Sequence, residues 1–265
     1  MMSKLHLPVQ LETFRNRIEK TVKPFIEISV AKDITTIHQS KFVGNPYLPK
    51  AIEHPKDEEG KPMKLLAQLN FDEIPHIEFM PPKGILQFFI SAEDDVMGIN
   101  FDNMTNQSNF RVLYHSEVIK DETLLVTDFS YMENLDTEYF PIEHELALSF
   151  SLEHEPISYG DFRSSELIGK SFSEIMGEDD EELEDVYERF SGEGHKIGGY
   201  PFFTQTDPRE YELNFQEHNI LLLQIDTHDD MGIMWGDSGV ANFFIRKEDL
   251  KKLDFSNVIY NWDCH

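Results

Sequence analysis

The most suggestive side chains for chemistry lie between Asp226 and Gly239. The chain reads Asp-Thr-His-Asp-Asp-Met-Gly over 226–232 and Trp-Gly-Asp-Ser-Gly over 235–239. Carboxylates and an imidazole at this density could bind a hard or borderline cation. The spacing matches neither a calcium-binding Asp-x-Asp-x-Asp-Gly loop nor a His-Glu-x-x-His zinc helix. A polar connection between strands explains the same residues, because Asp and Ser satisfy backbone groups and Gly turns the chain. We therefore expect no metal site and no cofactor.

Other reactive side chains form no recognisable catalytic pattern. His144 and His154 flank a predicted strand, which would separate them by about 33 Å and prevent them from sharing a metal. Cys264 and His265 lie at the chain end, where fraying disfavours a thiol–imidazole pair. The segment 192–195 lacks the lysine of a phosphate-binding loop, and no Gly-x-Ser-x-Gly motif occurs. No spacing selects one acid–base pair among 50 acidic residues, so an enzymatic role stays open.

The elements that must position these residues follow from a repeat. Three blocks recur in order at an offset of 155–156 residues: 41–48 with 196–203, 65–70 with 221–226, and 84–90 with 239–245. Each unit has a Gly-x-Pro turn, an apolar strand with one glutamine, and a second apolar strand. Gln68 and Gln224, buried at equivalent positions, are expected to bond each other or the backbone. We interpret 1–265 as a single domain formed by an internal duplication. Its two β-rich halves, about 38–120 and about 190–262, would share a core across a pseudo-twofold axis.

Helices are expected only at the periphery of this core. Helical periodicity predicts them over about 8–23, about 179–190 and 246–253. Alternation predicts half-exposed strands over 110–114 and 145–152. The fold class is therefore α+β, with β structure dominant.

The two units differ in residues that could form a site. At the repeat offset, Trp235 to Ser238 correspond to Met80 to Lys83. Residues that serve only the architecture should occur in both units, so residues present once are better site candidates. On this reasoning a concave surface of the second half carries the candidate ligand-binding residues Tyr200, Gln205, Asp226, Trp235, Asp237 and His195. An exposed Trp235 beside Asp237 would suit stacking and hydrogen bonding of a planar or sugar-like ligand.

The charge of the chain restricts its partners. It has 23 Lys and Arg against 50 Asp and Glu, a net charge of −27. Such a field repels nucleic acid and anionic membranes and attracts cations and basic proteins. The acidic helix predicted over 178–190 is either a solvated face or a docking site for a basic partner. A single cysteine, the absence of a signal-like apolar start and the absence of a membrane-length apolar run favour the cytoplasm.

These blocks resemble the YwqG-like family of bacterial proteins of unknown function. The likeness is carried by His195-Lys-Ile-Gly-Gly-Tyr-Pro201, by Leu222–Asp226 and by Met234-Trp-Gly-Asp-Ser-Gly239, while 66–90 is similar to the first half of that family. The resemblance implies a duplicated β-rich fold and no established catalytic activity. It also implies a possible relation to immunity proteins encoded beside bacterial toxins.

Two functions follow as expectations. The first is a non-catalytic protein-binding role, such as neutralisation of a basic toxin by an acidic surface. The alternative is a small-ligand or metal-binding protein, or an enzyme, that uses the Trp235–Asp237 region.

Overall fold

The computed structural model describes residues 5–176 and 188–265. Its strands are β1 (Lys23–Ala31), β2 (Lys41–Phe42), β3 (Lys64–Asn70), β4 (Ile85–Ile90), β5 (Phe110–His115), β6 (Leu146–Glu155), β7 (Lys196–Gly198), β8 (Ile220–Asp226), β9 (Val240–Ile245) and β10 (Val258–Asp263). The α-helices are α1 (Arg15–Thr21), α2 (Ser164–Ile168), α3 (Phe172–Met176), α5 (Pro208–Tyr211) and α6 (Lys247–Lys251). Short 3₁₀ helices are η1 (Val9–Phe14), η2 (Glu122–Leu124), η3 (Ser130–Met132), η4 (Leu213–Phe215) and η5 (Asp229–Met231). The described fold is thus β-dominated with few helices, as predicted.

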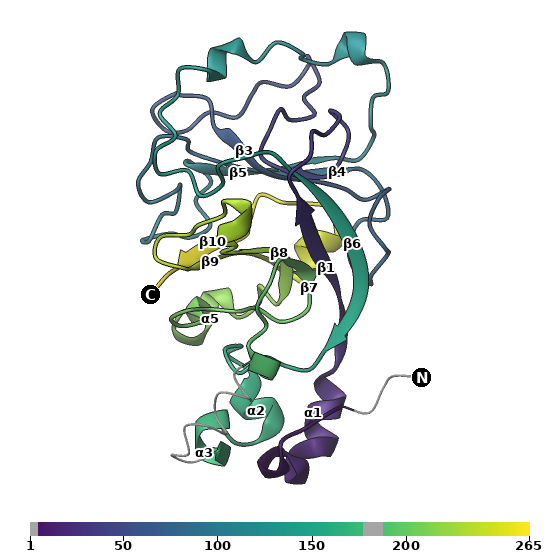
Figure 1. Cartoon of the computed structure of the whole chain (residues 1–265), viewed down its shortest axis with the longest axis vertical. Helices are drawn as coiled ribbons and strands as arrows, with labels where there is room; N and C mark the ends of the chain where they lie inside the picture. The colour runs from purple at the N-terminus through teal and green to yellow at the C-terminus, as the bar shows by residue number, and fades with distance from the viewer. Residues whose placement is uncertain (1–4, 177–187) are drawn as a thin grey trace.

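The strands form one antiparallel sheet of ten strands within the described residues, in the order β10-β9-β8-β7-β1-β6-β2-β3-β4-β5. The long strands β1 and β6 pair over 23–31 and 147–155 and lie at its centre. In Figure 1 they run as a ribbon from the upper set of strands to the lower set. The sheet therefore consists of two outer sets, β2–β5 and β7–β10, joined through this central pair.

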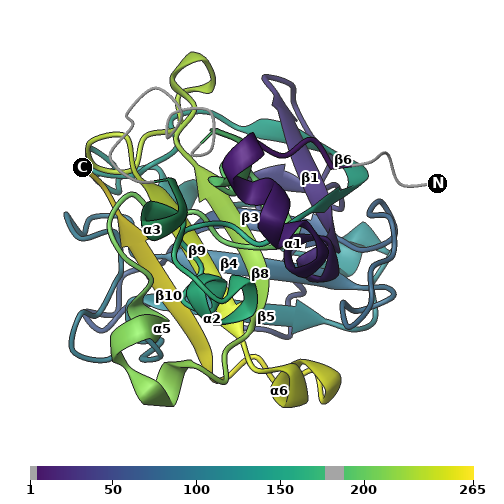
Figure 2. The ribbon, with the colours of Figure 1, turned by 90° about the horizontal axis from the view of Figure 1, so that it is seen from below.

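The two outer sets pack face to face. Strands β3, β4, β8 and β9 are buried along nearly their whole length, as their continuous apolar sequences predict. The rings of Phe88 and Phe243, one from each set, have centroids 4.7 Å apart, and Phe243 stacks on Tyr260 at 4.6 Å. Strands of the two sets run in different directions when seen from below (Figure 2). One apolar core therefore spans both halves.

The α-helices other than α6, which contributes Leu250, lie outside this core. Helices α1, α2 and α3 gather at one end of the molecule (Figure 1). A smaller apolar cluster there includes Leu11, Ile18, Ile168 and Phe172. The helix predicted over 8–23 is formed by η1 and α1, and the one predicted over 246–253 is shorter, over Lys247–Lys251. The acidic helix predicted over 178–190 lies outside the described residues except for its last three positions.

The outer sets repeat the same local contacts at the sequence offset. Gln68 Oε1 accepts a hydrogen bond from Tyr47 N, and Gln224 Oε1 accepts one from Phe202 N. The Nε2 of each glutamine donates to two backbone carbonyls, those of Ile37 and Gln39 or those of Gly192 and Gly194. A register shift follows Leu65 in one set and Leu221 in the other. The glutamines thus bond backbone within their own halves rather than each other. A duplication accounts for these correspondences; the duplication and its twofold axis stay predictions.

Candidate functional site

His195 and Asp226 are the predicted site residues that contact each other. The backbone N–H of Asp226 donates to His195 Nδ1 at 3.0 Å. The Asp226 carboxylate accepts from the backbone N–H groups of Gly194 and Thr227. His195 is buried and lies beside His228, with ring centroids 5.8 Å apart. Burial chiefly, with a smaller effect of His228, lowers the pKa of His195 to about 4, and burial raises the pKa of Asp226.

The first half contains an equivalent of this contact. There the backbone N–H of Asn70 donates to Ser40 Oγ at 2.9 Å, and Ser40 and Asn70 occupy the positions of His195 and Asp226 in the repeat. The same backbone bond therefore occurs once in each half with a different acceptor. His195 Nδ1 therefore has a structural role, as the acceptor of a backbone hydrogen bond.

Tyr200 lies apart from that pair, toward the helical end of the molecule. Its hydroxyl donates to the carbonyl of Thr21 at 2.6 Å, and its ring packs in the apolar cluster of α1–α3. Lys23 Nζ stands 3.6 Å from the centre of the ring. Burial raises the pKa of Tyr200 to about 12 and lowers that of Lys23 to about 7. Tyr200 thus joins the helices to the sheet.

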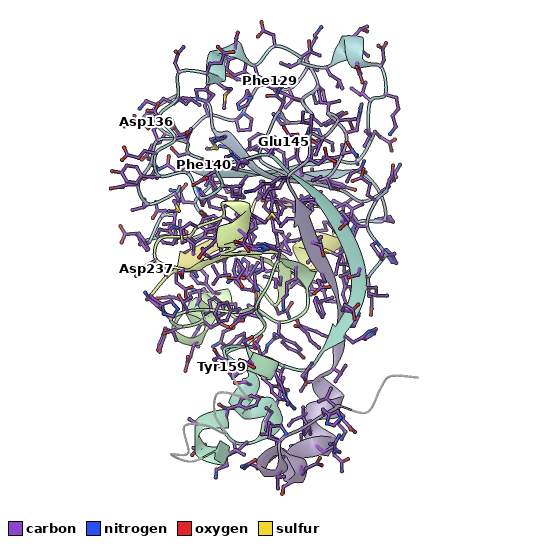
Figure 3. The ribbon with its side chains drawn as sticks, viewed as in Figure 1. Phe129, Asp136, Phe140, Glu145, Tyr159 and Asp237 are labelled. Carbon is purple, nitrogen blue, oxygen red and sulfur yellow. The ribbon has the colours of Figure 1, made fainter. Side chains whose placement is uncertain are left out.

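Trp235, Asp237 and Gln205 lie near the end of the chain. Gln205 Nε2 donates to the Cys264 carbonyl, and the Asp237 carbonyl accepts from His265 N. The Asp237 side chain is exposed, and Figure 3 shows this residue at the edge of the molecule. Trp235 is fully buried, so the expectation of an exposed tryptophan that stacks on a ligand is wrong. The six candidates do not form a single concave surface.

Trp235 instead packs against Trp262, a side chain that holds a loop of the other half. Its ring lies 6.3 Å from that of Trp262 on β10, and Trp262 Nε1 donates to the Val96 carbonyl at 2.8 Å. Tyr260 adds a second bond, from its hydroxyl to the Met97 carbonyl. The segment 94–102 after β4 is therefore fixed on β10 by aromatic donors.

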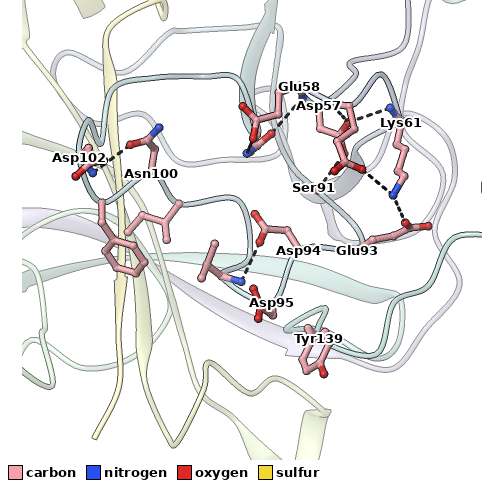
Figure 4. A pocket seen from close by; sticks show the side chains of 15 residues that line it. Asp57, Glu58, Lys61, Ser91, Glu93, Asp94, Asp95, Asn100, Asp102 and Tyr139 are labelled. Carbon is pink, nitrogen blue, oxygen red and sulfur yellow. Dashed lines mark hydrogen bonds and ion pairs between the residues drawn. The ribbon is translucent and has the colours of Figure 1, made fainter.

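That fixed segment forms one wall of an acidic cavity of about 640 Å³. The opposite wall is the turn 57–61 that precedes β3. Seven carboxylate residues line the cavity, namely Asp57, Glu58, Glu59, Glu93, Asp94, Asp95 and Asp102, against one cationic residue, Lys61. Figure 4 shows these carboxylates around the recess, with Tyr139 at one edge. The cavity therefore gathers seven of the 50 acidic residues of the chain around one recess.

Part of this charge is held by internal bonds. Asp57 accepts from the backbone N–H groups of Glu59 and Lys61 and from the Ser91 hydroxyl. Lys61 Nζ pairs with Glu93 at 2.7 Å and with Glu59 at 2.9 Å. These bonds raise the pKa of Lys61, and the bond from Lys61 lowers the pKa of Glu93. Asp57, Glu59 and Glu93 are thus occupied by structural partners.

Glu58 and Asp94 also accept hydrogen bonds, from Asn109 and from the backbone N–H groups of Val96 and Gly98. Two carboxylates of the lining are available to a ligand. Within the described residues the side chains of Asp95 and Asp102 are exposed and form no hydrogen bond or ion pair. Two aromatic residues on the lining are also exposed, Phe101 by 64 % and Tyr139 by 51 %. Carboxylates beside exposed aromatic faces suit the ammonium or guanidinium groups of a partner, through ion pairing and cation–π contact.

No group of three or more His, Cys, Asp or Glu side chains in the described part of the chain is arranged to hold an ion. No described helix is long and apolar enough to cross a membrane.

A second cavity, of about 590 Å³, adjoins the acidic one at Tyr139. It lies between the halves and is lined by Lys64 of β3, by the connection 137–143 and by the 229–236 segment. Met234 and Gly236, which flank the buried Trp235, are on its wall. The Trp-Gly-Asp segment therefore borders a cavity through its backbone and neighbours rather than through the indole ring.

Fold and site together define a β-dominated protein of one continuous sheet that presents an acidic recess between two loops of its first half. The chain belongs to the DUF1963 family, a domain of unknown function, which matches residues 40–264. This match extends over both outer sets of strands, β2–β5 and β7–β10. A comparison with curated proteins found no match. The YwqG-like label stays a prediction.

The acidic cavity was not predicted from the sequence. Its signals were the acidic triplets 57–59 and 93–95, which are 36 residues apart and stand out little in a chain with 50 acidic residues. They lie close together because β3 and β4 pair antiparallel. The segment that precedes β3 and the segment that follows β4 are therefore at the same end of this strand pair.

Proposed function

We propose that the protein binds a basic protein partner through the acidic cavity, as a non-catalytic binding protein of the immunity type. The observation that carries this proposal is the clustering of seven carboxylates with exposed Phe101 and Tyr139 around one recess. A lysine or arginine of the partner would enter the recess, pair with Asp95 or Asp102 and pack against an aromatic ring. A toxin with a basic site for an anionic substrate is a partner of this kind.

The net charge of −27 supports fast capture of such a partner. Complementary charge raises the association rate more than it lengthens the lifetime of a complex, and added salt weakens this effect. The alternative use of Trp235 as an exposed stacking residue is excluded by its burial.

The test begins with capture of partners from an extract of the producing cells at low and high salt. A captured protein is then purified, and its association rate is measured with the wild type and with a double variant, Asp95→Asn with Asp102→Asn. We expect the variant to associate about an order of magnitude more slowly, and the salt dependence to weaken.

A matched control removes two charges elsewhere. Glu166 and Glu210 are exposed and line neither cavity, and their carboxylates form no hydrogen bond or ion pair with the described residues. Glu166→Gln with Glu210→Gln should leave the association rate close to wild type. Equal effects of the two double variants would show that only the overall charge matters, and would contradict a role for the cavity.

A further inference from the structure

The second cavity contains an amine without an acceptor. Lys64 is partly buried at the start of β3, and its Nζ stands 4.2 Å from the centre of the Phe140 ring. This amine forms no hydrogen bond or ion pair with the described residues. Burial is the cause that lowers the pKa of its ammonium group.

Lys23 also faces an aromatic ring, that of Tyr200, but it does not line this cavity. Two other internal lysines are held differently. Lys41 Nζ donates to the carbonyls of Thr36 and Asn45, and Lys196 Nζ pairs with Glu155 at 2.8 Å. Both have partners that fix them in the fold. Lys64 has only an aromatic face beside it, so its amine is free to react with a molecule in the cavity.

The cavity suits a small neutral molecule. Its apolar lining residues Phe140, Ile142 and Ile233 are buried and expose little surface, whereas Met234 is 40 % exposed. A volume of about 590 Å³ lies in the range of small-molecule sites, which often occur between structural units. Glu138, Glu143 and Asp229 also line the cavity, and they would repel an anion but not a neutral carbonyl compound.

We propose that Lys64 is a nucleophilic amine that condenses reversibly with small neutral aldehydes bound in the cavity between the halves. The lone pair of neutral Nζ forms a bond to the carbonyl carbon while the carbonyl π electrons move to oxygen. Proton transfer from nitrogen to oxygen gives a carbinolamine. Loss of its protonated hydroxyl as water then yields an imine between Lys64 and the aldehyde carbon. One amine and one aldehyde give one imine and one water, with no oxidation or reduction. A lysine that burial partly desolvates is suited to this chemistry.

The experiment uses benzaldehyde with cyanoborohydride, which reduces the imine to a stable benzylamine that peptide mass mapping locates. At neutral pH we expect Lys64 to be modified several-fold faster than Lys32, an exposed lysine. The advantage should shrink as pH approaches the ordinary lysine pKa, because exposed amines then also lose their protons. Modification of Lys64 at or below the rate of Lys32 at neutral pH would overturn the proposal.

Two variants separate cavity binding from general reactivity. Lys64→Arg keeps the cation but removes the amine that forms an imine, so the site-specific adduct should disappear. Met234→Trp leaves Lys64 intact and fills the cavity, so modification of Lys64 should fall toward the rate of Lys32. Unchanged Lys64 modification in a folded Met234→Trp protein would show that the cavity plays no part. The acidic cavity is untouched by either variant, so this test is independent of partner binding.

Discussion

At the scale of single residues, burial decides the chemistry of His195. Its Nδ1 accepts a backbone hydrogen bond, which requires a neutral imidazole with the proton on Nε2. Burial stabilises the same neutral form and holds the pKa near 4. A histidine with this pKa is neutral at physiological pH. In the other half, Ser40 accepts the equivalent backbone hydrogen bond. His195 therefore acts as a structural acceptor.

This role predicts a dependence of stability on pH. The unfolded chain protonates histidine near its ordinary pKa of 6.5, but the folded chain does so only near 4. Between these values the unfolded state binds more protons, so stability is complete above pH 6.5 and is lost as pH falls toward 4. The loss from His195 amounts to roughly 3 kcal/mol. Urea unfolding at pH 7 and pH 4.5 should show a smaller loss for His195→Ser than for wild type.

The variant is matched to the fold because serine is the acceptor in the first half. His115, whose pKa burial also lowers to about 4, and Asp226 are present in both proteins, so their contributions largely cancel in the comparison. Identical losses in the two proteins would mean that His195 is protonated equally in the folded and unfolded states.

At the scale of elements, the two ends of β6 hold the turns of the two halves. Glu145 stands next to Gly44 at one end, and Glu155 stands next to Gly199 at the other. Both glycines have positive φ, +82° and +67°, and an added Cβ would lie within 2.6 Å of the Glu145 side chain at the first. The turns therefore need glycine both for their backbone conformation and for the close approach of a carboxylate.

The two glutamates differ in how much they stabilise their lysines. Glu155 lies 2.8 Å from the buried Lys196 Nζ, whereas Glu145 lies 3.9 Å from Lys41 Nζ, which also has two carbonyl acceptors. Removing the partner of a buried charge costs about 3–5 kcal/mol. We expect Glu155→Ala to lower the free energy of unfolding by about 3 kcal/mol, and Glu145→Ala to lower it clearly less. Chemical denaturation of the two variants tests this order, and a reversed order would contradict it.

At the scale of the whole molecule, the charge opposes the compact state. A net charge of −27 on 265 residues creates self-repulsion that folding increases and salt screens. Only some carboxylates are neutralised locally, as in the Lys61–Glu93 pair beside the acidic cavity. The cavity therefore carries charge that a basic partner would compensate.

Neutral salt should then stabilise the protein. We expect the melting temperature to rise by a few degrees as sodium chloride is raised from low to physiological ionic strength, where the screening length falls below about 10 Å. Calorimetry at fixed pH measures the change. The variant Asp95→Asn with Asp102→Asn should melt higher at low salt and gain less from added salt. A melting temperature that falls with added salt would show that attractive ion pairs outweigh the repulsion.

Much of the fold could be predicted from local sequence. The continuous apolar blocks around Gln68 and Gln224 became buried strands, because apolar segments of that length bury both faces in a sheet. Strand β1 was not predicted, although Ile26 and Ile28 alternate with exposed Glu27 and Ser29. This nine-residue strand directly follows the helix predicted over 8–23. The helical periodicity of that segment is stronger than the alternation of apolar and polar residues in the strand.

The candidate site could be predicted only in part. Sequence alone determined the acidity of the protein, its apolar strands and the glutamine that each of two strands buries. The structure decided that these glutamines bond backbone within their own halves rather than each other. Tertiary structure decided which polar residues meet. It buried Trp235 against Trp262, placed His195 on the Asp226 backbone, and brought the acidic segments 57–59 and 93–95 to one recess. Residue type and periodicity determine which side chains each segment buries. Strand pairing determines which distant segments lie side by side, and no local sequence pattern encodes that pairing.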